Sequence, residues 1–433
     1  MLVALFFCFR SAKVIIFISK FAVKISFYPF FDVCIFMLTH TDLFSLTLSV
    51  ETIVLLSALL IPVLVLLVVY RSRLLSVARC VSRCDAEDVP AAMPKVSVIV
   101  YSNNDSENLG KMLPDILAQD YPAGFEVIVV NDGASETTKD IVTALMQHHP
   151  NLSHTYAPEG SRYLSRKKLS LTIGVKAARY DYVIMTRSSC RVQSSRWLSL
   201  MARHFARGKQ VVLGYACYSP EDDMRFGARK RAYNALADAA TYLSSALAGR
   251  PYRGIDANIG YSRELFFKNR GFSQSLNLQY GDDDIFISEI ATPQNTAVEL
   301  STESQVRIVY RRDCRDVYRD IKARYTFTSR FVYGGARRLF GFCSAMAWLW
   351  LLLSVGAILS ALPNLFALAI VTAVSLCLWL PLMFAWKKLA CSLGGRRVFL
   401  MLPVRMLLRP LHNLAYRVRA VKGSKWNFTW EKV

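Results

Sequence analysis

Residues 96–135 are the stretch that most constrains the fold of this chain. They read VSVIVYSNNDSENLGKMLPDILAQDYPAGFEVIVVNDGAS. The two β-branched runs, Val96–Val100 and Phe125–Val130, are apolar enough to be buried on both faces, as the strands of a parallel sheet are. Between these runs the apolar residues fall at helical spacing, namely Leu109, Met112, Leu113, Ile116 and Leu117. The stretch therefore predicts a strand–helix–strand unit of an α/β fold.

The second predicted strand ends in an acidic turn, Asn131-Asp132-Gly133. In open α/β sheets, ligands bind in the crevice at the carboxyl ends of the strands, so this turn is a candidate ligand site. A dinucleotide-binding domain is a poor match, because Tyr101–Asn104 follow the first strand without the Gly-x-Gly turn that seats a pyrophosphate.

Strands and helices continue to alternate downstream. Further helices are predicted at Ser135–Gln147, Ser165–Arg179, Ser194–Arg207, Arg225–Leu247 and Glu264–Asn269. Further strands are predicted at Leu152–Tyr156, Tyr182–Thr186, Val211–Tyr215 and Asn258–Ser262. This alternation is typical of an α/β domain with a mostly parallel sheet.

Three apolar segments predict membrane anchoring. No charged residue lies between Glu51 and Arg71, and about 20 apolar residues cross the hydrocarbon layer of a bilayer. Four arginines follow this run by residue 83, which places its carboxyl side in the cytoplasm. The stretch from Arg338 to Lys387 is also uncharged and has room for two spans that turn at Pro363-Asn364. Such a hairpin starts and ends in the cytoplasm, the side of the membrane on which the first span ends.

The N-terminal residues 1–36 are aromatic and apolar but interrupted by basic residues. They fit an interfacial anchor, a poor first span, or an extension upstream of a start at Met37, and we favour the extension. At the other end, Val398–Val418 combines apolar residues and arginines at helical spacing, which predicts a helix in the membrane interface.

The basic composition points to lipid rather than nucleic acid. Lys and Arg number 53 against 32 Asp and Glu, a net charge of +21. Many of these charges flank the apolar segments, where anionic lipid headgroups attract them, and no RNA-binding signature is present. The ten cysteines form no CxxC pair, which indicates free thiols in a reducing compartment, and the six histidines show no metal-binding spacing.

Four further motifs carry chemistry-bearing residues. Gly281 precedes three successive acids, Asp282, Asp283 and Asp284, which read either as a helix N-terminus or as a catalytic site. The others are the basic run Arg166-Lys167-Lys168, the glycine-containing segment from Arg253 to Arg263 with Asn258 and Gly260, and the segment Lys322-Ala323-Arg324-Tyr325. Each of these three also has a purely structural interpretation. The basic run fits a solvated basic face, which we prefer for Arg166. The glycine-containing segment fits a loop entering a strand, and the Lys322 segment fits an amphipathic helix on the membrane.

In this order, the motifs resemble those of the family-2 glycosyltransferases, whose nucleotide-sugar-binding α/β domain is called GT-A. The matching residues are VSVIV, ENLGKMLPDILAQDYP and FEVIVVNDGAS, followed by GDDD, and the resemblance spans roughly Pro94 to Phe340. It implies an inverting transfer, with Asp283 as the catalytic base and Asp282 and Asp284 as the alternatives. It further implies that Asp132, Asn131 and Lys167 bind the donor, and that Asn258, Gly260, Arg324 and Tyr325 bind the acceptor.

The chain departs from this family at two motifs. Where the family places an Asp-x-Asp that holds Mg or Mn on the donor diphosphate, the chain reads Thr186-Arg187-Ser188-Ser189-Cys190. We therefore expect either that Arg187 neutralises the diphosphate in donor binding or that the site is inactive, and metal dependence stays open. In the Gln-x-x-Arg-Trp segment of membrane-bound members, Ile321 replaces Gln and Tyr325 replaces Trp, which weakens the case for processive synthesis.

The expected protein is a multi-pass enzyme of the inner cell membrane, with its catalytic domain on the cytoplasmic face. It would move a sugar from a nucleotide-sugar to a membrane-associated glycan or lipid-linked acceptor in polysaccharide biosynthesis, with no nucleic-acid partner. The alternative is a degenerate, non-catalytic binding scaffold. A transporter is disfavoured, because the spans carry no charge. The expected domains are an apolar extension (1–50), a transmembrane helix (51–71), a linker (72–94), the GT-A domain (95–340), a transmembrane hairpin (341–387) and a basic interfacial tail (388–433).

Overall fold

The computed structural model describes residues 48–132, 136–157, 164–218, 228–309, 314–332, 336–362, 364–394 and 402–422. Most of the N-terminal extension expected at 1–50 lies outside these residues, as do Gly133 and Pro363. The described residues form two compact units. One holds the residues up to Ala58 together with Leu353–Ser375, and the other holds Leu59–Leu352 and the residues from Leu376 onward.

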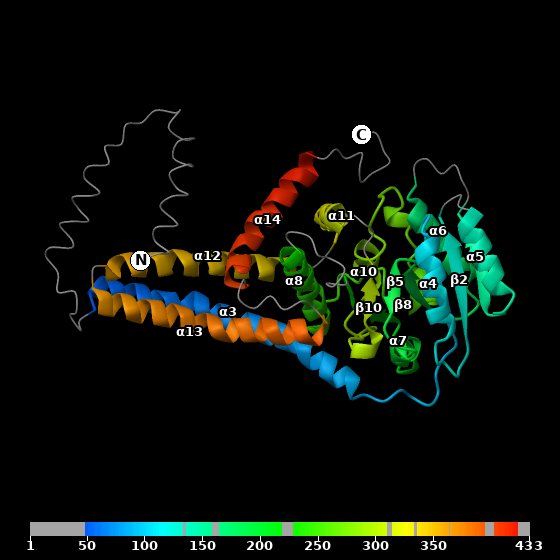
Figure 1. Cartoon of the computed structure of the whole chain (residues 1–433), viewed down its shortest axis with the longest axis horizontal. Coiled ribbons are helices and arrows are strands. Elements are labelled where there is room, and N and C mark those ends of the chain that lie inside the picture. Colours follow the sequence, from blue (N-terminus) through cyan, green and yellow to red (C-terminus); the bar gives the residue numbers. More distant parts are fainter. Residues whose placement is uncertain are drawn as a thin grey trace. The chain divides into compact units, whose positions relative to one another are not determined.

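The second unit contains a seven-stranded sheet with the order β3-β2-β1-β4-β8-β6-β9 (Figure 1). The strands are β1 (Val96–Ser102), β2 (Phe125–Asn131), β3 (Leu152–Tyr156), β4 (Tyr182–Arg187), β6 (Val211–Leu213), β8 (Ile259–Ser262) and β9 (Thr296–Val298). β1 pairs in parallel with β2 and β4, whereas β8 runs antiparallel to β4 and β6. The mostly parallel sheet confirms the predicted α/β class.

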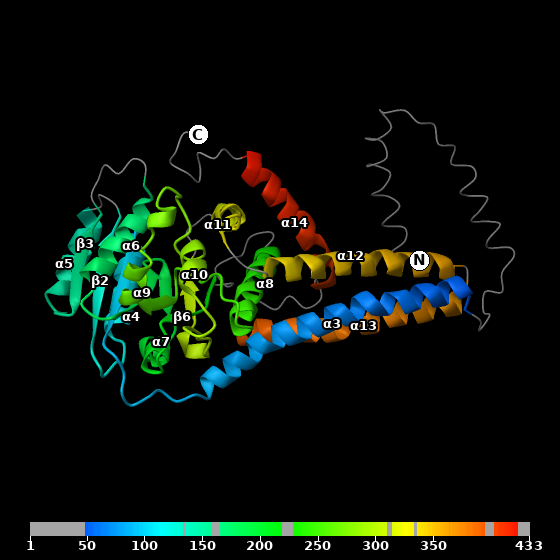
Figure 2. The same ribbon diagram turned by 180° about the vertical axis from the view of Figure 1, so that it is seen from behind.

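Helices cover both faces of the sheet, because alternate strand residues point to opposite sides. Val98 and Val100 share a core with α4 (Ser106–Leu117), α5 (Glu136–Met146) and α7 (Trp197–Ala206). Ile99 shares the other core with α6 (Arg166–Ala177), α9 (Arg263–Lys268) and α10 (Ile285–Ile290). These three helices are labelled in the reverse view (Figure 2). A Cβ on Gly174 of α6 would come within 2.9 Å of Ile99 and Val130, so glycine lets this helix lie close to the sheet.

Several elements near the end of the domain were not predicted. A second sheet has the order β5-β10-β7, with β5 (Cys190–Val192), β7 (Ala216–Tyr218) and β10 (Val306–Ile308). The helix α10 begins directly after Asp284, and α11 (Cys314–Thr328) contains Lys322–Tyr325, so a helix is present at both motifs for which it was one of the alternatives; α8 (Ala228–Leu247) lies where it was predicted. The missed strands have three residues each, which is too short for a recognisable alternation of apolar and polar residues.

Among the residues that the structure describes, three helices are long and apolar enough to cross a membrane: α3 (Val50–Asp85), α12 (Ala336–Ala361) over Gly341–Ala361, and α13 (Leu365–Ser392). Within the first unit, Thr52 of α3 and Ser360 of α12 are joined by a 3.0 Å hydrogen bond between their hydroxyls. The turn between α12 and α13 falls where the sequence predicts it. There the Asn364 side chain accepts hydrogen bonds from the backbone N–H groups of Phe366 and Ala367 at the start of α13. α13 continues to Ser392, five residues past the expected end of the hairpin at 387.

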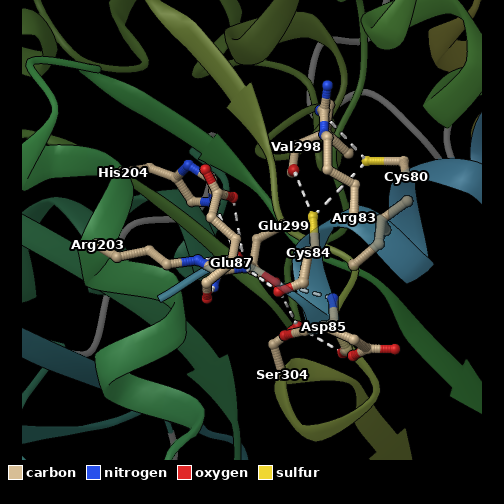
Figure 3. A network of polar contacts seen from close by, with 12 residues as sticks. Cys80, Arg83, Cys84, Asp85, Glu87, Arg203, His204, Val298, Glu299 and Ser304 are labelled. Atoms are coloured by element: carbon tan, nitrogen blue, oxygen red, sulfur yellow. Dashed lines mark hydrogen bonds and ion pairs between the residues drawn. The ribbon is translucent and has the colours of Figure 1, made fainter. Parts of the chain in front are cut away.

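The linker expected at 72–94 is wrong over its first part, because α3 continues without a break to Asp85. Its last turn is fixed to the domain by the fully buried Arg203 of α7 (Figure 3). The Arg203 guanidinium donates to the backbone oxygens of Cys84 at 2.9 Å and Glu87 at 2.6 Å, and it pairs with Glu299 at 2.7 Å. The bond to Cys84 thereby satisfies a carbonyl group in the last turn of α3, where carbonyls lack intrahelical partners, and the bond to Glu87 fixes the chain just beyond the helix.

The basic tail forms the helix α14 (Leu402–Lys422). Arg409 of α14 lies 3.1 Å from Asp238 of α8, which also pairs with Lys322 of α11 at 2.7 Å. An exposed apolar stripe runs along α14 at helical spacing and consists of Val404, Leu408, Leu411, Leu414 and Val418. The helix is therefore amphipathic, as predicted, and its place in a membrane interface stays a prediction.

Candidate active site

The carboxyl ends of β1, β2 and β4 meet at one edge of the sheet, where Tyr101 pairs with both Arg187 and Val130 in register. Asp132 follows β2 and is buried there. The Tyr101 hydroxyl donates to Asp132 at 2.6 Å, and the Arg166 Nε lies 3.0 Å from the other Asp132 oxygen. Arg166 thus pairs with an acid of the site, which corrects our preference for a solvated basic face.

Lys167 lies between two carboxylates. Its Nζ is 2.5 Å from an oxygen of Asp256 and 2.5 Å from an oxygen of Asp282. The Nε of Arg187, at the end of β4, lies 3.6 Å from the second oxygen of Asp256. Burial alone would raise the pKa of Asp256, but the positive charges of Arg187 and Lys167 outweigh it and hold this pKa below its ordinary value.

Asp283 is the least exposed residue of the three acids in the Gly281–Asp284 turn, with 1% exposure. The Tyr325 hydroxyl and, at 3.4 Å, the Asp256 backbone N–H donate to one of its oxygens. Its other oxygen has no hydrogen-bond partner among the described residues. Burial, together with the negative charges of the nearby Asp282 and Asp256, raises the pKa of Asp283 to about 7. Asp283 is therefore able to take up a proton near neutral pH.

The two neighbouring acids have other partners. Asp284 caps α10 by accepting from the Ile285 N–H at 2.7 Å, and it also accepts from the Thr328 hydroxyl. Asp282 faces Lys167 and lies 3.9 Å from the Arg324 guanidinium. Gly281 has a φ of +115°, a conformation that glycine adopts freely and that starts this turn.

The helix α11 brings Arg324 and Tyr325 into the site from a distant part of the sequence. The guanidinium of Arg253 lies 3.2 Å from the ring centroid of Tyr325, and that of Arg324 lies 4.2 Å from the ring centroid of Tyr280. Both distances fit cation–π contacts, which hold the two guanidinium groups beside the carboxylates.

Two of the expected acceptor-binding residues are core residues instead. Asn258 is fully buried; its amide nitrogen donates to the backbone oxygens of Tyr215 and Ser304, and its oxygen accepts from Trp197. A Cβ on Gly260 would lie 2.9 Å from the ring of Phe205, so this glycine serves packing against the sheet. The structure thus corrects the expectation that Asn258 and Gly260 contact an acceptor.

The remaining predicted residues gather at the site, together with four whose roles the sequence did not suggest. Asn131, at the end of β2, is buried beside Asp132. The residues that were missed are Tyr101, Arg166, Arg253 and Asp256. Asp256 lies in a loop whose shape depends on long-range contacts, such as the bond from the Gly254 N–H to the Asp283 carbonyl at 2.8 Å. Its position just before the glycine-containing strand was the one local signal for it.

Two cavities flank the carboxylates. The smaller, about 10 Å³, is lined by Tyr101, Lys167, Arg187, Asp256 and Asp282, among others, and is large enough for about one water. The larger, about 230 Å³, lies on the Tyr325 side. Its polar lining comes from α8, α11 and α14 and from the Arg253 loop, and includes Asp238, Arg253, Asp284, Lys322, Tyr325 and Arg409.

The residues at the end of β4 do not fit a divalent metal. Arg187 brings a positive charge to the position where an acid would be needed, and Asp256 and Asp282 are already paired with cationic side chains. In the described part of the chain, no group of three or more His, Cys, Asp or Glu side chains is placed to hold a metal ion.

Comparisons with known proteins identify the domain. The model for Glycosyl transferase family 2 matches residues 97–272. No match was found among curated proteins. Among solved structures, the mannosyltransferase PcManGT from Pyrobaculum calidifontis, in complex with GDP-Man and Mn2+, is 18% identical with a TM-score of 0.48; the match covers 82% of this chain and 99% of that one. TarS 1–349 from S. aureus, in complex with UDP-GlcNAc, is 14% identical with a TM-score of 0.39, and the match covers 77% and 92%.

The family match runs from β1 to β8; it includes Asp132, Lys167, Arg187 and Asp256 of the site described above, and it ends before the Gly281–Asp284 turn. The chain therefore carries a glycosyl transferase family 2 domain at residues 97–272.

Proposed function

We propose that this chain is an inverting glycosyltransferase. It would transfer a sugar from a nucleotide-sugar donor to a membrane-associated glycan or lipid-linked acceptor. The observation that carries the proposal is the environment of Asp283. It is an enclosed carboxylate with a pKa of about 7, and it accepts a hydrogen bond from Tyr325, which lines the larger cavity.

In the proposed reaction, the acceptor hydroxyl gives its proton to Asp283 as its oxygen attacks the anomeric carbon of the donor sugar. A bond forms between the acceptor oxygen and this carbon, and the bond between the carbon and the donor phosphate oxygen breaks. The nucleoside diphosphate leaves with the electron pair. The transition state resembles an oxocarbenium ion, so the negative charge of Asp282 nearby also stabilises it.

The donor would bind over the ends of β1, β2 and β4. We assign Asp132 and Asn131 to the nucleoside and Lys167 and Arg187 to the diphosphate. Asp132 is already oriented by Tyr101 and Arg166, so it is preorganised for hydrogen bonds to a nucleoside.

The acceptor would enter through the larger cavity, which reaches Tyr325 and Asp284 beside the base. α14 and the start of α12 contribute Arg409, Asn413, Gly341 and Ser344 to its lining. These helices adjoin or form the apolar segments, so an acceptor held at a membrane surface would approach from this side. Arg324 and Tyr325 are the acceptor-side residues in this proposal.

We further propose that the three long apolar helices span the inner cell membrane with the catalytic domain in the cytoplasm. The arginines after residue 70 and the basic residues at both ends of the hairpin support this orientation. The apolar stripe on α14 supports a position of that helix in the interface.

A non-catalytic scaffold is the second candidate. The observation in its favour is the small volume, about 10 Å³, left between Lys167, Arg187 and the acids. The enclosed Asp283 argues against it, because a scaffold has no use for a carboxylate that titrates near neutral pH.

A donor screen separates the two candidates. The purified full chain would be incubated with several nucleotide-sugars, with and without membrane lipid extract, and nucleotide release measured. The enzyme proposal expects release from at least one donor, increased by the extract. Nucleotide-sugar binding without release under any of these conditions would support the scaffold.

A further inference from the structure

Lys167 carries its ammonium group at the point where two buried carboxylates converge. We infer that this ammonium, held by Asp256 and Asp282, takes the place of a divalent cation, so that the donor diphosphate binds without metal. The inference rests on the proposed function for the identity of the donor, and it adds the means by which the diphosphate charge is neutralised.

The geometry supports a built-in cation. The Nζ is equidistant, at 2.5 Å, from one oxygen of each acid, and the two carboxylate side chains are 9% and 1% exposed. Two carboxylates that share a buried site repel each other unless a cation lies between them. The lysine is positioned by the first turn of α6, where the Ser165 hydroxyl accepts from the Lys168 N–H.

Electrostatics keep the lysine charged. Burial alone would lower the pKa of Lys167, but the charges of Asp256 and Asp282 outweigh it and raise this pKa above its ordinary value. The ammonium is therefore present throughout the neutral pH range, as a bound metal ion would be.

A metal ion in addition to Lys167 would meet repulsion. The second oxygen of Asp256 already faces the Nε of Arg187 at 3.6 Å, so a divalent ion on Asp256 would lie close to two positive side chains. The space between these groups is about 10 Å³, the volume of about one water, whereas Mg²⁺ usually keeps several waters.

The same side chains retain hydrogen-bonding capacity for phosphate. An ammonium has three N–H donors; Lys167 donates one hydrogen bond, to Asp256, and its contact with Asp282 is an ion pair. The Arg187 guanidinium has five donors in a planar fork, so it is able to contact Asp256 and a phosphate oxygen together. The two cations would then offset the charge that develops on the departing diphosphate.

The first test is nucleotide binding by the full chain in detergent, with UDP and GDP as probes in isothermal titration. Binding should be the same in EDTA as in Mn²⁺. Lys167→Ala and Lys167→Gln should weaken it about 10- to 100-fold, the value of one charge-assisted hydrogen bond. Lys176→Ala, an exposed lysine on the same helix, is the matched control and should bind as the unmodified chain does. Binding by the unmodified chain that EDTA abolishes would overturn the inference.

The second test needs no nucleotide. Lys167→Ala leaves Asp256 and Asp282 facing each other without their ammonium, so the variant should gain a Mn²⁺ site visible by electron paramagnetic resonance. The unmodified chain and Lys176→Ala should lack this site, and the double variant Lys167→Ala with Asp256→Asn should lose it again. Mn²⁺ bound equally by the unmodified chain and Lys167→Ala would contradict the inference. Thermal unfolding of each variant shows that it is folded.

These outcomes separate this inference from the proposed function. Sugar transfer that requires a metal would leave the function standing and overturn the inference. EDTA-resistant binding of UDP or GDP without transfer of any sugar would support the inference and count against the proposed reaction.

Discussion

At the residue scale, the three successive acids Asp282, Asp283 and Asp284 have different partners in the site. Asp282 faces Lys167, Asp284 caps α10, and Asp283 has an enclosed oxygen without a described partner. The sequence placed all three in one motif, but it could not distinguish them. Their roles depend on Lys167, Thr328 and Tyr325, which come from distant segments.

The pH dependence of transfer follows from Asp283. Its pKa is raised to about 7, and only the ionised carboxylate accepts a proton, so kcat/KM should rise with pH and level off above about 7. The measurement is a pH profile with a donor found by the screen. A profile that is flat between pH 5 and 8, where we expect the rise, would show that a different group limits the reaction.

Tyr325 should tune this profile. Its hydroxyl donates to Asp283, and a hydrogen bond to the charged form of a carboxyl lowers its pKa. Tyr325→Phe removes the donor but keeps the ring beneath Arg253, so the midpoint of the profile should move to higher pH. A lower maximal rate with an unchanged midpoint would instead indicate that Tyr325 acts through packing alone.

At the element scale, the helices and strands with a long, regular spacing of apolar residues were predictable from the sequence, and the short strands were not. The strands β1 to β4 and the helices α4 to α8 lie where the apolar spacing of the sequence places them, within a few residues. The strands of the second sheet are short, and their pairing is decided by long-range contacts. The end of α3 was missed because the fully buried Arg203 on α7 satisfies its last carbonyls, and no local pattern shows this.

The buried ion pair that holds the end of α3 should contribute to the stability of the fold. Arg203 and Glu299 are fully buried, and His204 shares the Glu299 carboxylate at 2.7 Å. Glu299→Ala removes the buried partner of the arginine and leaves it only the half-exposed Glu87 carboxylate at 4.0 Å, so the variant should lower the free energy of unfolding by about 3–5 kcal/mol. Thermal unfolding in detergent measures the change.

The matched control for this prediction is Glu303→Ala. Glu303 pairs with Arg196 at 2.9 Å, but both side chains are about half exposed, so the loss should stay below about 1 kcal/mol. Equal destabilisation by the two variants would contradict the role we give to the buried pair at the end of α3.

At the scale of the whole molecule, the charges around the apolar helices predict the topology. If the three long apolar helices of the described residues span a membrane, the basic residues after the first and at both ends of the hairpin would place the domain and the C-terminus on one side. A reporter fused after Val433 and another inserted between Val89 and Met93 should both report the cytoplasm. A periplasmic signal from either reporter would contradict this orientation. It would also contradict the proposal that the domain meets its nucleotide-sugar donor in the cytoplasm.

The central claim is that Asp283 is the base of a glycosyl transfer, and Asp283→Asn tests it most directly. The amide keeps the size of the side chain but cannot take the acceptor proton, so turnover should fall by about 100-fold or more while nucleotide affinity changes little. The decisive measurement is sugar transfer and UDP or GDP binding on the same purified variant. Transfer at a near-normal rate would contradict the assignment and move the role of base to Asp282 or Asp284.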